Sequence, residues 1–259
     1  MRKAWLGFFV LGLAVLLVAW PDQGLAQENP SQLYLMGDFL VDASRAPEYE
    51  SALKELLAHL VKHGFPFRFD TYVTDDSHYF VVYGLKGFAE VDRWAKAWAE
   101  LALKMGPANL QAVHRRIVAA EIERVYQFWY YRSDISFVPD KERLKPDEIG
   151  HYTWDFVWVV PGKEAEFEAL NKEWSALSKA RKSRDPFLTY VGDLGTKMPV
   201  YIWFEYGKTP ADTAAAEERF WKLMGDAGAD LSKRTRALIR KLESKAGRYR
   251  PDLSYAPRK

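Results

Sequence analysis

The stretch that decides the fold is Arg132-Ser-Asp-Ile-Ser-Phe-Val-Pro139, because it returns near the end of the chain as Arg250-Pro-Asp-Leu-Ser-Tyr-Ala-Pro257. The shared pattern is Arg-x-Asp-(Ile/Leu)-Ser-(Phe/Tyr)-x-Pro, at a spacing of 118 positions. The same offset aligns Thr71-Tyr72-Val73 with Thr189-Tyr190-Val191, and an offset of 117 aligns Asp38-Phe39 with Asp155-Phe156. Because these matches recur in order, the chain is predicted to be an internal duplication.

The N-terminus has the parts of an export signal. Residues 1–3 are basic at two positions, residues 4–20 carry no charge, and Gly24 and Ala26 are small. This pattern predicts a signal peptide over residues 1–26, cleaved after Ala26, with no stable membrane insertion of the mature protein. The alternative is an uncleaved anchor, because the apolar run reaches the lower limit of a membrane span.

Cysteine and charge limit the partners of the chain. No cysteine is present, so disulfides and lipid attachment at a cysteine are excluded. An exported protein that relies on its core alone is typical of the bacterial periplasm or exterior. The 37 basic and 35 acidic residues give a net charge of +2, which offers no basic footprint for nucleic acid. The oligomeric state stays open.

The first repeat, residues 27–138, alternates between two patterns. Runs rich in aromatic and β-branched residues predict strands, and apolar residues at helical spacing predict helices. Gly64 and Gly106-Pro107 mark helix ends. The expected elements are a strand at 34–42, a helix at 47–63, a hairpin of strands 67–73 and 78–83, helices at 88–105 and 108–122, and a strand at 124–132.

The second repeat, residues 151–259, has the same order and follows a charged linker at residues 139–150 that contains two prolines. Thr209-Pro210 is an N-cap followed by proline at the first helical position. The expected elements are a strand at 152–160, a helix at 163–182, strands at 187–191 and 200–206, helices at 211–224 and 230–246, and a strand near 248–255.

Each half therefore reads β-α-β-β-α-α-β, the ferredoxin-like order with one additional helix. A single such sheet leaves one face uncovered. We predict an α+β fold in which two tandem ferredoxin-like repeats pack sheet to sheet as a pseudo-dimeric barrel. This duplicated pattern resembles the dimeric α+β barrel superfamily, which includes antibiotic-biosynthesis-type monooxygenases, NIPSNAP-like proteins and the chlorite dismutase group. The resemblance covers nearly all of the mature chain and assigns no close family.

The repeated arginines allow two interpretations. In a ferredoxin-like sheet the fourth strand lies beside the first, so Arg132 and Arg250 could form structural ion pairs with Asp38 and Asp155. Alternatively, the two arginines recognise an anion in a shared cavity. The structural interpretation is favoured, because both copies of a duplication need the same fold but rarely the same active site.

Histidine is the residue that haem or metal chemistry would need. His59 and His63 share a helix face, and His114 is the best single candidate for an axial haem ligand. His78 borders an acidic turn and suggests no role. No histidine follows His151, whereas the resemblance to chlorite dismutases implies a haem ligand from a helix of the second half. We expect no cofactor and no metal, with haem as the alternative.

Aromatic side chains make up 15% of the chain and alternate along the predicted strands. A barrel lined by such rings is either a filled core or a pocket for a flat ligand. The main hypothesis is non-catalytic binding of a small aromatic or apolar ligand between the sheets, with Arg132 or Arg250 meeting any acidic group. The predicted aromatic binding residues are Trp129, Tyr131, Trp154, Trp158, Tyr190 and Trp203.

Two further function classes stay open. One is an oxidoreductase of the monooxygenase type, either haem-dependent through His114 or independent of any cofactor. The other is a structural or protein-partner role in the cell envelope, through exposed helix faces. No nucleophile elbow, P-loop or zinc-protease motif is present in the sequence.

Overall fold

The structure is a computed structural model that describes residues 32–257. The predicted signal peptide and its cleavage site lie outside these residues. Within residues 32–257, none of the helices combines the length and the apolar character that a membrane crossing requires.

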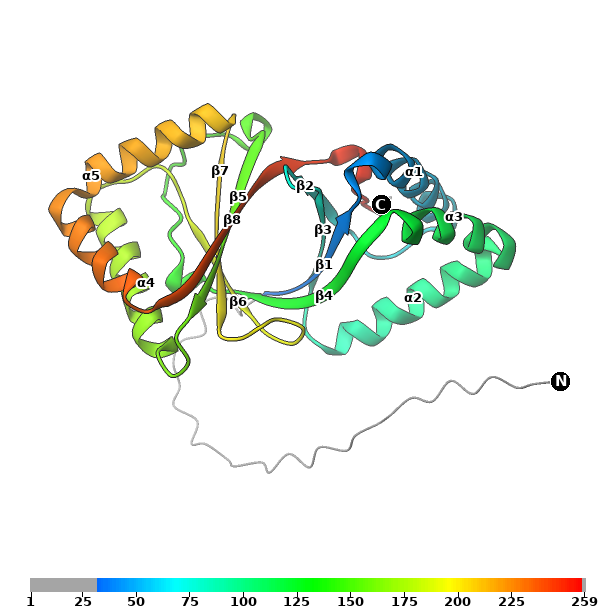
Figure 1. Cartoon of the computed structure of the whole chain (residues 1–259), viewed down its shortest axis with the longest axis horizontal. Helices are drawn as coiled ribbons and strands as arrows, with labels where there is room; N and C mark the ends of the chain where they lie inside the picture. Colours follow the sequence, from blue (N-terminus) through cyan, green and yellow to red (C-terminus); the bar gives the residue numbers. More distant parts are fainter. Residues whose placement is uncertain (1–31, 258–259) are drawn as a thin grey trace, which may run out of the picture. The chain divides into compact units, whose positions relative to one another are not determined.

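The described residues contain eight strands that close into one antiparallel barrel (Figure 1). The strand order around the barrel is β1-β3-β2-β8-β5-β7-β6-β4. The strands are β1 (Leu33–Val41), β2 (Asp70–Thr74), β3 (His78–Leu85), β4 (Glu121–Tyr131), β5 (His151–Val159), β6 (Leu188–Gly192), β7 (Val200–Gly207) and β8 (Ile239–Tyr249).

Helices cover the outer face of the barrel on two sides, as Figure 1 shows. The first half carries three of them, and the second half carries two. They are α1 (Ala46–His63), α2 (Ala89–Met105), α3 (Pro107–Ala120), α4 (Glu164–Ala180) and α5 (Pro210–Arg236). Short 3-10 turns, η2 (Ser133–Ile135) and η4 (Pro251–Leu253), lie within the two copies of the repeated stretch.

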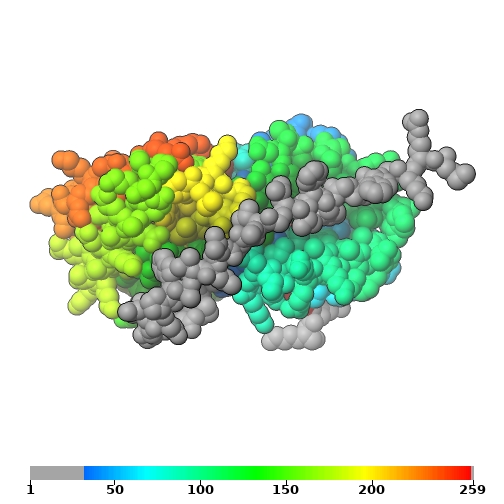
Figure 2. Space-filling view, turned by 90° about the horizontal axis from the view of Figure 1, so that it is seen from below, coloured from blue at the N-terminus to red at the C-terminus, as the bar shows by residue number. Residues whose placement is uncertain are grey.

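The predicted fold class is confirmed by the strand order. The first half reads β4-β1-β3-β2 and the second reads β8-β5-β7-β6, which is the same order in both. The two sheets also join at their edges, where β2 pairs with β8 and β4 pairs with β6. Each sheet edge is therefore satisfied by the other half of the same chain. In Figure 2 the first half (blue to green) and the second half (yellow-green to orange) lie on opposite sides.

The largest error in the predicted elements lies near the end of the chain. Residues 239–246 belong to β8 and not to a helix, and α5 ends at Arg236 after a break at Gly225, where φ is 57°. The side chains that β8 turns into the barrel include Lys241 and Lys245. A strand with a charged inner face lacks the apolar alternation that identifies strands.

A second error concerns the alignment of Asp38 with Asp155 at an offset of 117. The pairing registers place β1 over β5 at an offset of 118, so Asp38 is equivalent to Phe156. Asp38 and Phe156 both face the barrel interior, whereas Asp155 bonds to Ser244 on the other face of the sheet. A shift of one residue moves a strand side chain to the opposite face.

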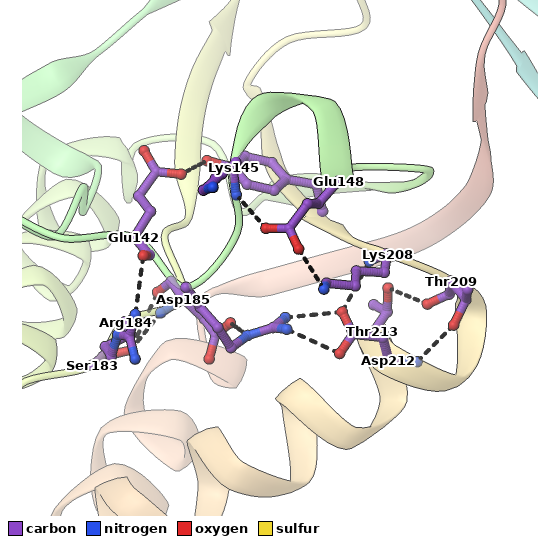
Figure 3. Close-up of polar contacts among 12 residues, drawn as sticks. Glu142, Lys145, Glu148, Ser183, Arg184, Asp185, Lys208, Thr209, Asp212 and Thr213 are labelled. Atoms are coloured by element: carbon purple, nitrogen blue, oxygen red, sulfur yellow. Dashed lines mark hydrogen bonds and ion pairs between the residues drawn. The ribbon is translucent and has the colours of Figure 1, made fainter.

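The predicted linker is tied firmly to the second half (Figure 3). The guanidinium of Arg143 donates to Asp185 at 2.7 Å and to Asp212 at 2.9 Å. Lys208 Nζ lies 2.6 Å from Glu148 Oε1, as the close-up shows. Residues 139–150 therefore act as an ordered part of the second half rather than as a free connection.

Candidate active site

The barrel interior is packed at its centre and hollow at one end. The centre consists of Met36, Phe80, Trp129, Trp154, Phe156, Val200 and Ile202. Beyond it lies a cavity of about 660 Å³, lined by inward-facing residues of both halves and by residues 195–197 of the β6–β7 loop. Trp129, Phe156 and Val200 belong to both sets, so they form the floor of the cavity.

The opposite end of the barrel is filled by tyrosines. Tyr34 lies 5.6 Å from Tyr190, and Tyr72 lies 5.1 Å from Tyr152, measured between ring centroids. Desolvation by burial raises the pKa of Tyr72 and of Tyr190. Edge-on contacts of this kind are typical of a packed aromatic core. The space for a ligand described above therefore lies at the other end of the barrel.

An aspartate–histidine pair stands in the wall of the cavity. His78 Nδ1 lies 2.6 Å from Asp38 Oδ1, and each side chain is 17% exposed. The β1–β3 register sets Leu40 opposite His78 and Asp38 opposite Phe80, so the two side chains share the inner face on a diagonal. Because an ionised carboxylate only accepts hydrogen bonds, Nδ1 is the nitrogen that donates to Asp38, and Nε2 is left for other contacts.

The pair begins a run of charged side chains that we call the charged arc, made of Asp38, His78, Asp76, Lys245, Glu243 and Lys241. His78 Nε2 lies 3.8 Å from Asp76 Oδ2, and Lys245 Nζ lies 2.5 Å from the same oxygen. Glu243 then lies 3.6 Å from Lys245 and 2.7 Å from Lys241. The arc follows β1, β3, the β2–β3 turn and β8 around one side of the cavity.

The arc lowers the pKa of two of its carboxyl groups, Asp76 and Glu243. Burial alone would raise the pKa of Asp76, but hydrogen bonds from Lys245 and Thr74 lower it overall. The hydrogen bond from Lys241 lowers the pKa of Glu243. Lys245 is only 9% exposed, and alternating charges are what make its burial tolerable.

The second half supplies an aromatic wall that faces the Asp38–His78 pair. The rings of Phe156 and Trp158 lie 6.2 Å apart and nearly parallel, and Trp129 meets Phe156 edge-on at 6.0 Å. Lys241 Nζ lies 4.3 Å from the centre of the Trp158 ring, a cation–π contact. One side of the cavity can therefore hold a flat ring, and the other can exchange a proton with it.

The predicted aromatic residues lie in four different places. Trp129 and Trp158 line the cavity, and Trp154 belongs to the packed centre. Tyr131 and Tyr190 contact each other at the filled end, with ring centroids 5.5 Å apart. Trp203 points to the helices instead, where its Nε1 donates to Asn171 Oδ1 at 2.9 Å. The predicted set is thus not brought together in one place.

The repeated arginines lie outside the cavity. Arg132, at the end of β4, donates to Asp134 at 2.7 Å and to Glu168 of α4 at 2.9 Å. Glu168 also accepts from Tyr201 Oη at 3.0 Å. The predicted partner Asp38 is wrong, because Arg132 points to the helix layer while Asp38 points into the barrel. We call the group of Arg132, Asp134, Glu168 and Tyr201 the Arg132 clamp.

The same arrangement joins the end of the second half to the first half, and we call it the Arg250 clamp. Arg250, at the end of the second half, donates to Asp252 at 2.8 Å and to Glu50 of α1 at 2.5 Å, and Glu50 accepts from Tyr79 Oη at 2.9 Å. The predicted partner Asp155 is wrong for the same reason. Each clamp joins the last strand of one half to the first helix of the other, so the repeated arginines have the structural role that the duplication favours.

Serine and threonine complete both copies of the repeated stretch. Ser136 Oγ accepts from the backbone N–H of Thr189, whose own hydroxyl donates to the carbonyl of Ile135. Ser254 and Thr71 repeat these contacts with the carbonyl of Leu253. This explains why the Thr-Tyr-Val matches share the offset of the Arg-x-Asp stretch.

Four of the five histidines in residues 32–257 do not line the cavity and cannot hold haem there. His114 is exposed on α3, His151 Nδ1 is 2.8 Å from Thr213 Oγ1, and His59 stacks on His63 along α1. His78 does line the cavity; its Nδ1 is held by Asp38, and its Nε2 lies 3.8 Å from Asp76 Oδ2, too far for a hydrogen bond. Residues 32–257 also contain no group of three or more side chains placed to hold a metal ion.

The sequence interpretation missed Asp38 and His78. The sequence did contain a signal for this pair, because β-strand alternation and the hairpin at residues 74–77 determine which side chains share a face of the sheet. The shifted alignment of Asp38 with Asp155 hid it, since a residue with an apparent copy in each half was taken as structural.

No family model matches the chain, and no curated protein matches its sequence. Several solved structures share its fold. An anthrone oxidase-like protein matches with a TM-score of 0.57 and 13% identity, over 87% of this chain and 94% of that protein. A chlorite dismutase variant from Candidatus Nitrospira defluvii matches with a TM-score of 0.52 and 8% identity, over 86% and 94%.

A proposed monooxygenase from Lactobacillus acidophilus NCFM matches with a TM-score of 0.51 and 7% identity, over 85% of this chain and 94% of that protein. At such low identities the likeness concerns the fold. The strand order, the paired sheet edges and these neighbours agree. The chain therefore has the fold of the dimeric α+β barrel superfamily, with both halves of the barrel on one polypeptide.

Proposed function

We propose that this protein is an oxidoreductase of the monooxygenase type that oxidises a flat aromatic substrate in the barrel cavity with dioxygen. The Asp38–His78 pair is its proton acceptor. The observation that carries the proposal is a carboxylate-held imidazole, at 2.6 Å, in the wall of a cavity whose floor is aromatic. A filled barrel would need neither the space nor the pair.

The proton transfer follows from the geometry of the pair. A substrate ring on the aromatic wall presents an acidic O–H or C–H bond to His78 Nε2. His78 accepts this proton, and the carboxylate of Asp38 keeps the ring oriented through Nδ1–H and stabilises the imidazolium that forms. The deprotonated substrate is electron-rich and is the species that reacts with dioxygen.

The redox step balances without a bound cofactor when the substrate carries an activated CH2 group. Carbon loses two C–H bonds and gains one C=O bond. One oxygen atom of O2 enters the carbonyl, and the other leaves as water with the two hydrogens. Carbon loses four electrons and O2 accepts four. An anthrone becomes an anthraquinone in this way.

Two structural neighbours support the reaction class, since one is described as anthrone oxidase-like and one as a proposed monooxygenase. The shared fold alone does not carry an activity, so the support comes from its agreement with the cavity. In the non-catalytic hypothesis a ligand binds in the same cavity without being converted. The two hypotheses differ only in whether His78 accepts a proton from that ligand.

The test is oxygen uptake with anthrone as the probe, with anthraquinone formation followed by absorbance. We expect His78→Gln to lower the rate about 10²- to 10⁴-fold, the range of a general base, and Asp38→Asn to lower it less. His114→Gln, the same change at an exposed histidine that does not line the cavity, is the matched control and should keep the rate. If anthrone binds but the unmodified protein oxidises it no faster than His78→Gln does, the protein is a carrier and the proposed enzymatic function is overturned.

We also propose that the protein acts outside the cytoplasm, on the strength of residues 1–26 and the absence of cysteine. Fractionation of a bacterial host, with mass measurement of the N-terminus, tests this proposal. A chain that keeps residues 1–26 and stays with the cytoplasm would contradict it.

A further inference from the structure

The exposed rim of the cavity is polarised, and we infer from it the chemical class of the substrate: a hydroxylated aromatic ring that carries a carboxylate. Lys197 and Arg240 receive the carboxylate, and the opposite end of the molecule meets His78. The inference rests on the proposed function, because it assigns the ligand of the same cavity.

Most charges that line the cavity already have partners. Lys241 is paired with Glu243, and Lys245 is paired with Asp76. Lys197 and Arg240 differ, because neither has an ion pair within residues 32–257, and both are exposed at the rim. A pair of cations without a carboxylate partner, beside an apolar cavity, favours an anionic ligand group.

The two cations lie on the same side of the rim. Lys197 belongs to the loop that leads into β7, and Arg240 Nη2 reaches the carbonyl of Met198 in that loop at 3.4 Å. Trp158 and Lys241 line the cavity beside them. A ring that stacks on Trp158 therefore brings its substituent to Arg240 and Lys197.

The Asp38–His78 pair lies across the barrel from the loop that carries Lys197, whereas Arg240 stands on β8, which only β2 separates from β3. In the strand order, β3 and β7 are separated by three strands in either direction, so the start of β3 at His78 faces the start of β7 at Val200. Glu123 of β4 also lines the cavity without an ion pair within the described residues, and the β6–β7 loop packs on the same strand at Tyr126 and Gln127. The two exposed cations attract a ligand carboxylate and the carboxylate of Asp38 repels it, which orients the substrate.

The substrate must therefore have two functional ends. A carboxylate binds at Lys197 and Arg240, and an acidic hydroxyl or carbon acid points to His78. A neutral aromatic molecule would fill the same space without a preferred direction. Orientation is a general requirement for proton transfer, because the base must lie within hydrogen-bond reach of the proton.

The experiment compares 6-hydroxy-2-naphthoate with 2-naphthol, which has the same ring system without the carboxylate, by titration calorimetry on the purified protein. We expect the carboxylate to bind about five- to tenfold more tightly, the factor for two partly exposed charge contacts. The double variant Lys197→Gln/Arg240→Gln should bring this ratio close to one and leave the affinity for 2-naphthol unchanged. Arg240→Lys keeps the charge and should keep most of the preference.

The outcomes separate the inference from the proposed function. If 2-naphthol binds and the carboxylate binds no more tightly, or if the double variant keeps the preference, the inference is overturned while the cavity remains a binding site. If neither compound binds, the proposed function fails together with it. The preference should also weaken as salt rises, because the two cations are exposed.

Discussion

The two clamps and the cavity differ in how the duplicated halves use equivalent positions. In the clamps the equivalents are identical: arginine at 132 and 250, aspartate at 134 and 252, glutamate at 168 and 50, and tyrosine at 201 and 79. Both copies make the same bonds across the seam between the halves. The clamps hold the barrel together, and the fold needs them twice.

In the cavity the equivalent positions hold different residues. The pairing registers match Asp38 with Phe156, Leu40 with Trp158, His78 with Val200, Glu123 with Lys241 and Gln127 with Lys245. One half therefore supplies the Asp38–His78 pair, and the other supplies an aromatic surface and cations. Divergence at equivalent positions, within a shared frame of bonds, sets the cavity apart from the clamps.

The largest expected effect is on the rate of catalysis, which should depend on the cavity and not on the clamps. His78→Gln should lower the rate of anthrone oxidation by about 10²- to 10⁴-fold and lower the free energy of unfolding by only about 1 kcal/mol, because the glutamine amide can still donate to Asp38. Rates and urea denaturation on the same preparation measure both. A variant that unfolds at markedly lower urea would make His78 part of the frame and remove the contrast.

The next effect concerns stability. Arg250→Met should lower the free energy of unfolding by about 2 kcal/mol, because it leaves the carboxylate of Glu50 without its cation in a half-buried place. Arg132→Met should cost about half as much, since Arg132 is 26% exposed and Arg250 is 14% exposed. Urea denaturation measures both. Equal rates of oxidation per folded molecule are expected, and a lost rate would place the clamps in the site.

Acid should weaken the clamps before it affects the packed core. Hydrogen bonding to Arg132 holds the pKa of Asp134 at about 2, below its ordinary value of about 3.9. A lowered pKa stabilises the fold above the unfolded value, and this contribution is lost as the pH falls from about 4 to about 2. Urea midpoints over this range measure the loss. In Arg132→Met the slope should be shallower, and an unchanged slope would mean that other carboxylates dominate.

The smallest effect tests the haem alternative. His114→Ala should leave oxidation, stability and the visible spectrum unchanged, because the side chain is exposed on α3 and does not line the cavity. A spectrum of the purified protein with added haem, before and after the substitution, provides the measurement. If the protein binds haem and His114→Ala abolishes that binding, the redox centre would lie outside the barrel cavity.

The sequence alone determined the duplication, the α+β class and the structural role of the repeated arginines. The repeated stretch indicated the duplication, and strand and helix periodicity indicated the fold class. The structural role of the arginines followed because both copies of a duplication need the same fold. It also predicted Trp129 and Trp158, because aromatic residues that alternate on a strand must line one of its faces.

The location of the candidate site could not be predicted from sequence, because it depends on contacts between distant strands. Asp38 and His78 are 40 positions apart, and their contact depends on a strand register that a single-residue shift would destroy. Lys245 meets Asp76 only because β8 of the second half pairs with β2 of the first, and its charged inner face resembled a helix. The residues at these equivalent positions already differ in the sequence, but strand register and barrel closure decide that they face one common space.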